Sequence, residues 1–121
     1  MPEGERDGRG SYRSAAPESL RRGSIFREIY RTGRRFRGSA IKVVYRRNAL
    51  GVIRLGFSVS RKTGTAVDRN RFRRRIRSLA RNRGTGLGAD LIVSPAGETA
   101  EVPWDGMEKD FEKLLELLEG Q

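Results

Sequence analysis

Residues 54–77 read RLGFSVSRKTGTAVDRNRFRRRIR, and they contain the clearest structural signals in the chain. Between residues 54 and 60, Leu55, Phe57 and Val59 alternate with smaller or polar residues. Successive side chains of a β-strand point to opposite faces of a sheet. This period of two therefore predicts a strand with one buried face.

The second half of the stretch predicts an amphipathic helix between Gly64 and Gly84. Its apolar residues recur at helical spacing, and arginines occupy most of the other positions. These apolar residues are Phe72, Ile76, Leu79 and Ala80. Residues 61–83 contain ten Lys or Arg residues and a single acid, Asp68. The helix is therefore expected to have a cationic outer face.

The residues before this stretch predict a helix and two strands. Ser24 is a suitable N-cap for a short helix that ends near Gly33, a glycine expected in the left-handed conformation. Its apolar face would consist of Ile25, Phe26, Ile29 and Tyr30. Residues 40–45 are rich in Ile and Val and predict a strand, and residues 35–38 predict a shorter one. Residues 1–16 lack periodicity and predict a disordered tail.

The residues after the basic helix predict one more strand and a last helix. Residues 89–94 form a short apolar run that Pro95 ends. The last helix is expected to begin near Asp105, with acids opposite its apolar stripe. That stripe consists of Met107, Phe111, Leu114, Leu115 and Leu118. The order of elements predicts an α+β sandwich with helices packed on one sheet.

Length and composition narrow the possible functions. A chain of 121 residues fits one compact domain, expected over residues 17–121. The absence of Cys and His excludes a disulfide, a Cys/His zinc site, a Cys nucleophile and a His general base. Because no apolar run approaches the roughly 18 to 20 residues of a membrane span, and residues 1–22 lack the apolar centre of a signal peptide, we expect a cytoplasmic protein with no membrane partner.

The cationic helix is the strongest functional signal in a chain of net charge +11. Guanidinium groups match phosphate oxygens with paired donors and stack on bases. A helix face that serves only solubility usually mixes charges of both signs, and this one hardly does, which favours nucleic-acid binding. Just before the helix, Lys62 and the backbone near Gly64 could also meet a phosphate. An ordinary glycine turn with exposed cations is an equally good interpretation there.

Aromatic residues offer a second, weaker signal. Phe26 and Tyr30 lie one turn apart on the first helix, and rings near a basic surface can stack on single-stranded bases. Periodicity favours core packing for Phe26 and leaves Tyr30 open, because a tyrosine hydroxyl prefers a wet edge. Trp104 is interpreted as packing at the start of the last helix.

The sequence of residues 54–77 resembles the protein component of bacterial ribonuclease P. That family combines a strand of the form R-L-G-x-x-V-S-[KR]-K with G-x-A-V and then R-N-R-x-[KR]-R on a helix, and residues 54–77 follow this pattern. Phe26 with Tyr30 and Gly33, and residues 90–93, match in the expected order. The resemblance extends over about residues 20–118.

The resemblance implies a fold and an activity. The fold would be a two-layer α/β sandwich of order α-β-β-β-α-β-α, similar to the second domain of ribosomal protein S5 and with a left-handed crossover. The activity would be that of a ribonucleoprotein that removes 5′ leaders from precursor tRNA. Hydrolysis would belong to the RNA subunit and its Mg²⁺ ions, so the protein would have no catalytic residue, no strong metal ligand and no obligate protein partner.

The resemblance also assigns residues to two RNA partners. The set facing the ribonuclease P RNA would be Arg61, Lys62, Arg69, Asn70, Arg71, Arg73, Arg74 and Arg77. The set lining a cleft for the single-stranded leader of precursor tRNA would be Phe26, Tyr30 and Tyr45, although counting places Val44 at the third position. Two departures from the family pattern stand in the helix, where Arg73 replaces lysine and Ser78 replaces a common glutamate.

Two other classes of protein are alternatives to this one. A structural ribosomal or nucleoid-type protein would bind nucleic acid and stimulate no cleavage. A nuclease that uses carboxylates and a metal ion has less support, because the acids cluster far from the basic helix in sequence and lack ligand spacing.

Overall fold

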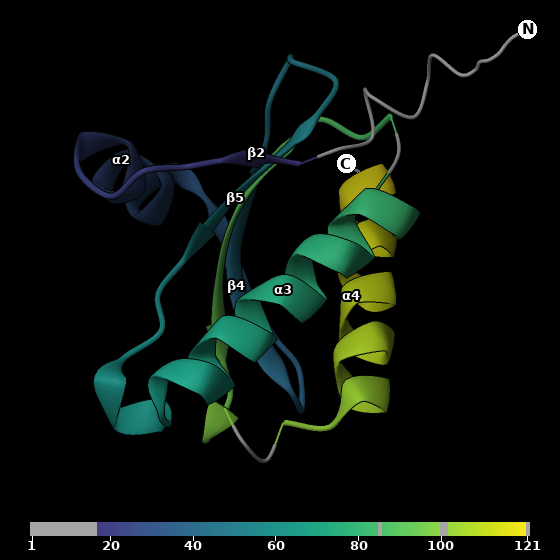
Figure 1. Ribbon diagram of the computed structural model, residues 1–121. Coiled ribbons are helices and arrows are strands. Elements are labelled where there is room, and N and C mark those ends of the chain that lie inside the picture. The colour runs from purple at the N-terminus through teal and green to yellow at the C-terminus, as the bar shows by residue number, and fades with distance from the viewer. Residues whose placement is uncertain (1–16, 85, 100–101, 121) are drawn as a thin grey trace, which may run out of the picture.

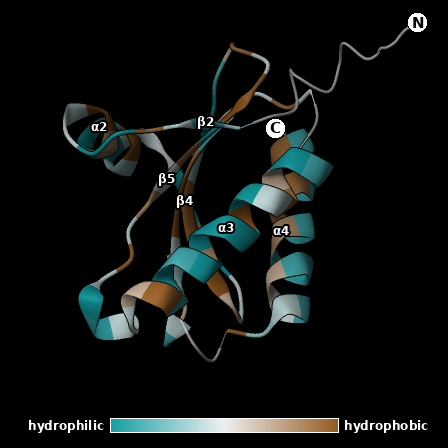
Figure 2. Ribbon diagram, in the orientation of Figure 1, coloured by the Kyte–Doolittle hydropathy of each residue, from teal (hydrophilic) through white to brown (hydrophobic). Residues whose placement is uncertain are grey.

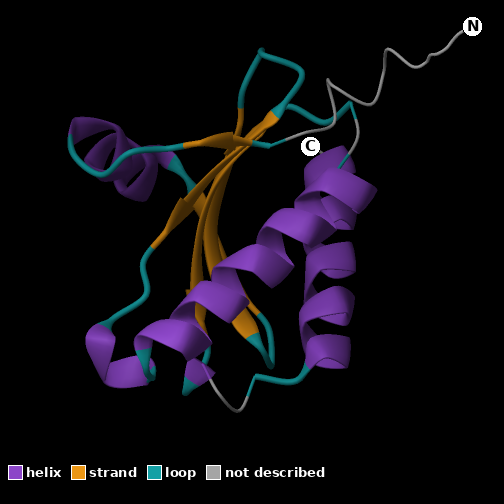
Figure 3. Cartoon of the chain, in the orientation of Figure 1, coloured by secondary structure: helices purple, strands orange, loops and turns teal. Residues whose placement is uncertain are grey.

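The structure, a computed structural model, describes residues 17–84, 86–99 and 102–120. The predicted disordered tail, residues 1–16, lies outside these described residues. One β-sheet stands in the middle of the domain, with one helix on one side and two on the other (Figure 1). Figure 3 shows the same arrangement coloured by secondary structure.

The sheet has five strands in the order β2-β5-β6-β4-β3. The strands are β2 (Glu18–Ser19), β3 (Arg34–Arg37), β4 (Ile41–Arg47), β5 (Ile53–Phe57) and β6 (Ala89–Pro95). β4 pairs antiparallel with β3 and β6, whereas β5 pairs parallel with β6 and β2. Every strand predicted from sequence is present, and the two-residue β2 is an addition.

The helices are α2 (Ser24–Thr32), α3 (Ala66–Arg83) and α4 (Trp104–Glu119), with a 3₁₀ turn η1 (Arg61–Thr63) before α3. After β2 the order is helix, three strands, basic helix, strand, helix, which confirms the predicted α+β order. Parallel strands require a long crossover connection. The basic helix α3 supplies it between β5 and β6, so the two parallel neighbours and the cationic segment belong to one unit.

α2 ends near Gly33 as predicted, but the N-cap residue and the conformation of Gly33 differ from the prediction. Gly23, with φ 131°, occupies the N-cap, and Ser24 is the first helical residue, so the predicted Ser24 cap is wrong. Gly33 has φ −83° and is not left-handed. A Cβ at Gly33 would meet the backbone oxygens of Ile29 and Tyr45 at 2.7 and 2.8 Å. Glycine is required there by close approach of the chain to β4, and not by a positive φ.

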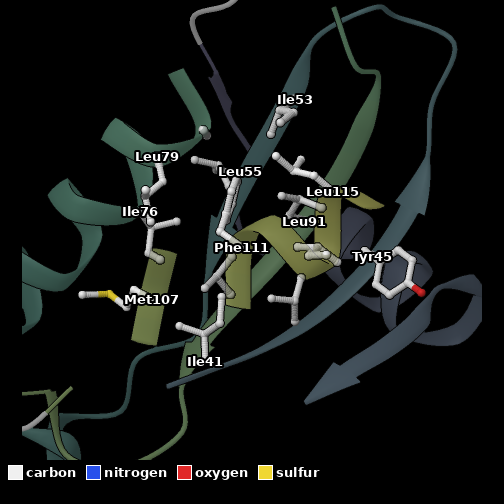
Figure 4. Packing of buried hydrophobic residues seen from close by; sticks show 14 of the residues in the cluster. Ile41, Tyr45, Ile53, Leu55, Ile76, Leu79, Leu91, Met107, Phe111 and Leu115 are labelled. Carbon is white, nitrogen blue, oxygen red and sulfur yellow. The ribbon is translucent and has the colours of Figure 1, made fainter. Parts of the chain in front are cut away.

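The main core lies between the sheet and the two helices α3 and α4. Alternate residues of β4, β5 and β6 face it, and Figure 4 shows Ile41, Leu55 and Leu91 packed beside Phe111 and Ile76 of these helices. Figure 2 shows the hydrophobic colour along the strands and the hydrophilic colour over much of α3. Burial of these alternate side chains provides the main driving force for folding.

A second, smaller cluster lies on the other face of the sheet, under α2. It joins Phe26 and Ile29 of α2 to Val44 of β4 and Ile92 of β6. The sandwich of sheet, α3 and α4 is thus extended by α2 on the opposite face. Alternation along β4 decides whether Val44 or Tyr45 lies beside α2. Val44 faces α2, whereas Tyr45 belongs to the main core and is 4% exposed. The placement of Tyr45 in a cleft beside α2 is therefore wrong.

A buried acid fastens α4 to the start of β4. One carboxylate oxygen of Asp110 accepts hydrogen bonds from the backbone nitrogens of Ala40, at 2.7 Å, and Ile41, at 3.1 Å. The same carboxylate lies against Gly38, where a Cβ would collide with it. Asp110 is an exception to the prediction that the acids of the last helix face away from the core, since the residue is 4% exposed.

Candidate nucleic-acid interface

Two successive caps fix the start of the basic helix. The Ser60 hydroxyl accepts a hydrogen bond from the Lys62 nitrogen at 3.1 Å and so caps η1. The Thr65 hydroxyl accepts one from the Asp68 nitrogen at 3.1 Å and caps α3. Such side-chain caps satisfy backbone N–H groups that the helix itself leaves free. Arg61 and Lys62 are thereby held exposed just before α3, as the sequence predicted.

Three arginines form one row along α3. Arg69, Arg73 and Arg77 are four residues apart, so they lie one above the other on the same side of the helix. Burial, and then the charges of Arg69, Arg77 and Arg22, lower the pKa of Arg73. These cations therefore repel one another in the free protein, and an anion bound to this α3 arginine row would relieve that repulsion.

Arg22 extends the row past the end of β5. Its guanidinium donates a hydrogen bond to the Phe57 carbonyl oxygen at 3.4 Å and lies 5.5 Å from the Phe26 ring centre. The Arg77 guanidinium lies 5.2 Å from the Phe57 ring centre. The sequence analysis missed Arg22, because only the fold brings residue 22 beside a helix that begins at residue 66.

The other predicted residues of α3 do not all share this side. Arg73 donates a hydrogen bond to the Asn70 side-chain oxygen at 2.9 Å, which fixes Asn70 next to the row. Arg74 is exposed. Arg71 lies 3.5 Å from the Asp68 carboxylate, and residues two apart on a helix do not face each other, so Arg71 points away from Arg73. The eight predicted RNA-facing residues are thus gathered on one helix and the turn before it, but on more than one of its sides.

A cleft of about 450 Å³ opens between α2 and the β3–β4 edge of the sheet. Its wall and floor include Tyr30, Arg35, Arg37, Lys42, Val44 and Ile92. The Tyr30 ring is 36% exposed, and the Arg35 guanidinium lies 5.9 Å from its centre. Arg35 and Arg37 pair across the strands with Val44 and Lys42, so all four side chains share the face that α2 covers. The α2 cleft therefore combines an aromatic wall with three cations.

The two predicted aromatic residues of α2 have different places. Phe26 is 6% exposed and does not line the cleft, which confirms the interpretation as core that periodicity favoured. Its ring lies against Gly56, where a Cβ would collide with it, and it meets the Tyr30 ring edge-on at 6.5 Å between centres. The buried Phe26 ring thus packs against the Tyr30 ring that lines the cleft. The cations of β3 and β4 were missed, although alternation along those strands could have indicated them.

A buried ion network holds α2 to the sheet. Asp90 of β6 is fully buried and accepts hydrogen bonds from Arg54, at 2.7 and 2.9 Å, and from Arg46, at 3.0 Å. The Asn48 amide donates a further bond at 2.8 Å. Arg46 also reaches the Glu28 carboxylate of α2 at 2.8 Å. Burial alone would raise the pKa of Asp90, but the bonds from Arg54, Asn48 and Arg46 hold that pKa below its ordinary value.

Among the described residues, two carboxylates are buried, and both are occupied by donors of the protein itself. Asp90 is held by two arginines and Asp110 by two backbone nitrogens, so neither has an arrangement that suits a divalent cation. Within residues 17–84, 86–99 and 102–120, no three acidic side chains converge on a metal site. In the same part of the chain, no helix is both long and apolar enough to span a bilayer.

Comparison with known proteins gives one consistent result. A family model described as Ribonuclease P matches residues 15–119. A protein of Thermotoga maritima, described as "Ribonuclease P protein component", is 36% identical over 107 residues, which are 84% of this chain and 89% of that protein. A protein of Caldanaerobacter subterraneus with the same description is 33% identical over 98 residues, which are 79% of this chain and 84% of that protein.

Solved structures agree with the sequence comparison. The RNase P protein from Thermotoga maritima superposes with a TM-score of 0.69 at 29% identity, over 81% of this chain and 94% of that one. The RNase P protein of Staphylococcus aureus superposes with a TM-score of 0.70 at 27% identity, over 82% of this chain and 93% of that one.

Proposed function

Because the chain belongs to the ribonuclease P protein family, we propose that it is the subunit that binds the ribonuclease P RNA and the 5′ leader of precursor tRNA. Members of this family are the protein component of an endoribonuclease complex that acts in tRNA processing, and that description holds for this chain. The proposal adds the assignment of each basic surface to an RNA partner.

The α3 arginine row, with Arg22, is assigned to the RNA subunit. The observation that carries the proposal is the crowding of three of these four cations around the fourth, Arg73. Burial, and then the charges of Arg69, Arg77 and Arg22, lower the pKa of Arg73. Arginine binds phosphate with paired donors, and each phosphate that is neutralised releases counterions. Affinity should therefore fall with salt at a log-log slope of roughly −0.7 to −0.9 for each phosphate contacted.

The α2 cleft is assigned to the leader. Its exposed ring at Tyr30 can stack on a base, while Arg35, Arg37 and Lys42 can neutralise the phosphates on either side. Only a single strand presents unstacked bases to such a wall, which suits an unpaired leader better than a helical stem. The leader set proposed here is Tyr30, Arg35, Arg37, Lys42 and Val44, with Phe26 in support.

The hydrolysis of the phosphodiester bond is assigned to the RNA subunit. Its Mg²⁺ ions would supply the charge needed for phosphodiester hydrolysis, and the protein would screen the repulsion among leader, tRNA and RNA subunit. This division suits a chain without His or Cys in which the buried carboxylates of Asp90 and Asp110 are held by protein donors. We place this function in the cytoplasm, with no obligate protein partner.

Reconstitution tests the proposal. Precursor tRNA is incubated with a bacterial ribonuclease P RNA at low Mg²⁺, with the protein, without it, and with the protein alone. We expect the protein to stimulate cleavage at the mature 5′ end and to be inert by itself. The double variant Arg69→Glu, Arg73→Glu should lose the stimulation. Lys113→Glu, which makes the same kind of charge reversal on the exposed face of α4, should keep it.

The second candidate is a structural RNA-binding protein with the same fold. It predicts that the chain binds the RNA subunit and leaves cleavage unchanged at every Mg²⁺ concentration. That result would overturn the proposed function while leaving the RNA-binding surfaces intact.

A further inference from the structure

A second basic hollow lies on the outer side of α3, apart from the α2 cleft. It is an open groove of about 670 Å³, lined by Arg74, Arg75, Arg77, Ser78, Arg81 and Trp104. Four of these six residues are arginines, and the sixth is the first residue of α4. The fold therefore brings an aromatic ring from residue 104 beside cations 23 to 30 positions earlier in the chain.

Trp104 is placed as a platform and not as core. It is 37% exposed, so the interpretation of this residue as packing describes only part of its surface. The Arg75 guanidinium lies 5.6 Å from its ring centre, within the range of a cation–π contact. That contact holds the ring in place where the groove opens.

Within the described part of the chain, no acidic side chain forms an ion pair with an arginine of the groove. The ion pairs of α3 there join Arg71 to Asp68 and Arg83 to Glu108 and Glu112. Ser78 lies between the arginines of the groove and is small and neutral.

We propose that this groove binds one unpaired nucleotide of the ribonuclease P RNA subunit, with its base against Trp104 and its phosphates on the surrounding arginines. Cations combined with an exposed ring are the composition of sites for single-stranded nucleic acid. The RNA subunit is favoured over the leader because Arg77 lines this groove and also belongs to the α3 arginine row assigned to that subunit. The inference rests on the proposed function and adds a stacking contact to it.

The fluorescence of Trp104 tests the inference directly, because it is the only tryptophan of the chain. The full chain is titrated with an end-labelled ribonuclease P RNA, while the label anisotropy reports binding and the tryptophan emission reports the groove. A leader oligonucleotide is titrated in parallel. We expect the RNA subunit to quench the emission in step with binding, and the leader to bind without quenching.

Substitutions measure the strength of the contact. Stacking of a base on an aromatic side chain contributes about 1–3 kcal/mol, so Trp104→Ala should weaken binding of the RNA subunit roughly 5- to 150-fold. Trp104→Phe should restore most of the loss. Ser78→Glu should weaken binding more than Asn82→Glu, which adds the same charge one turn away and outside the groove lining. Thermal melts of each variant separate lost binding from lost folding.

The outcomes separate this inference from the proposed function. The groove is not a nucleotide site if the RNA subunit binds without quenching the tryptophan emission and if Trp104→Ala and Ser78→Glu bind the subunit as tightly as the wild type and the Asn82→Glu control do. In that case the α3 arginine row can still bind the subunit. Quenching by the leader alone overturns the assignment to the RNA subunit. If the label shows no binding at all, both the inference and the proposed function are wrong.

Discussion

Replacement of Asp90 by asparagine should destabilise the protein more than any exposed charge substitution. The carboxylate is fully buried and accepts four hydrogen bonds, two of them from Arg54 and one each from Arg46 and Asn48. Asparagine keeps the shape but replaces one acceptor by a donor, which would face N–H groups of these partners. It also leaves two guanidinium groups without their counter-charge.

The magnitude follows from the burial of the partners. Removing one member of a fully buried ion pair costs about 3–5 kcal/mol. The side chains of Arg46 and Arg54 are 23% and 25% exposed, so water can partly solvate them in the variant. We therefore expect a loss of about 2–3 kcal/mol in the free energy of unfolding. For a domain of this size, that loss lowers the melting temperature by about 10 °C.

The assay is urea unfolding of Asp90→Asn beside the wild type, with Glu116→Gln as an exposed control expected within about 0.5 kcal/mol. The pH dependence adds a second readout. The pKa of Asp90 is lower in the folded state than in the unfolded state. The contribution of Asp90 to the free energy of unfolding is therefore fully present above the pKa of the unfolded state, and it is lost as the pH falls through the pKa of the folded state. Wild type should lose stability on acidification below about pH 4, and Asp90→Asn less steeply. A loss no larger than that of the control would refute this account of the network.

Three further results are expected. Gly38→Ala should cost about 1–3 kcal/mol in urea unfolding, because its methyl group would collide with the buried Asp110 carboxylate, whereas Gly97→Ala, with open space around it, should be neutral. Arg73→Ala should reduce the salt slope of RNA-subunit binding by roughly 0.7 to 0.9, provided that this residue contacts one phosphate, and an unchanged slope would exclude that contact. Tyr30→Leu should weaken binding of precursor tRNA by about 1–3 kcal/mol and leave binding of leaderless tRNA unchanged, as measured by competition.

The sequence was sufficient to predict the elements because their signals are local. Alternation at Leu55, Phe57 and Val59 and the helical recurrence of Phe72 and Ile76 depend on near neighbours only. The end of α2 near Gly33 was predicted correctly, but the left-handed conformation of Gly33 was not, because glycine is required there by its approach to β4, which no local pattern records. The position of α2 on the face opposite α3 is equally non-local.

The candidate site divides in the same way. Residues of α3 could be predicted because they lie on one helix, whereas Arg22 and Trp104 join that surface only through the fold. Tyr45 was misplaced by a single residue of register, and a shift of one along a strand moves a side chain to the other face. Counting had pointed to Val44, and the structure supports the count over the preference for an aromatic ring.

Net charge alone could not have distinguished the arginines that stabilise the fold from those available to RNA. Arg46 and Arg54 are bound to the buried carboxylate of Asp90, so diverting either of them to a phosphate would be costly. The α3 arginine row instead faces cations, and burial with their repulsion lowers the pKa of Arg73. Of these two groups, it is the α3 arginine row whose repulsion a bound anion would relieve. Affinity for RNA should therefore depend on how acids are distributed around each arginine. It should not follow the total charge of +11.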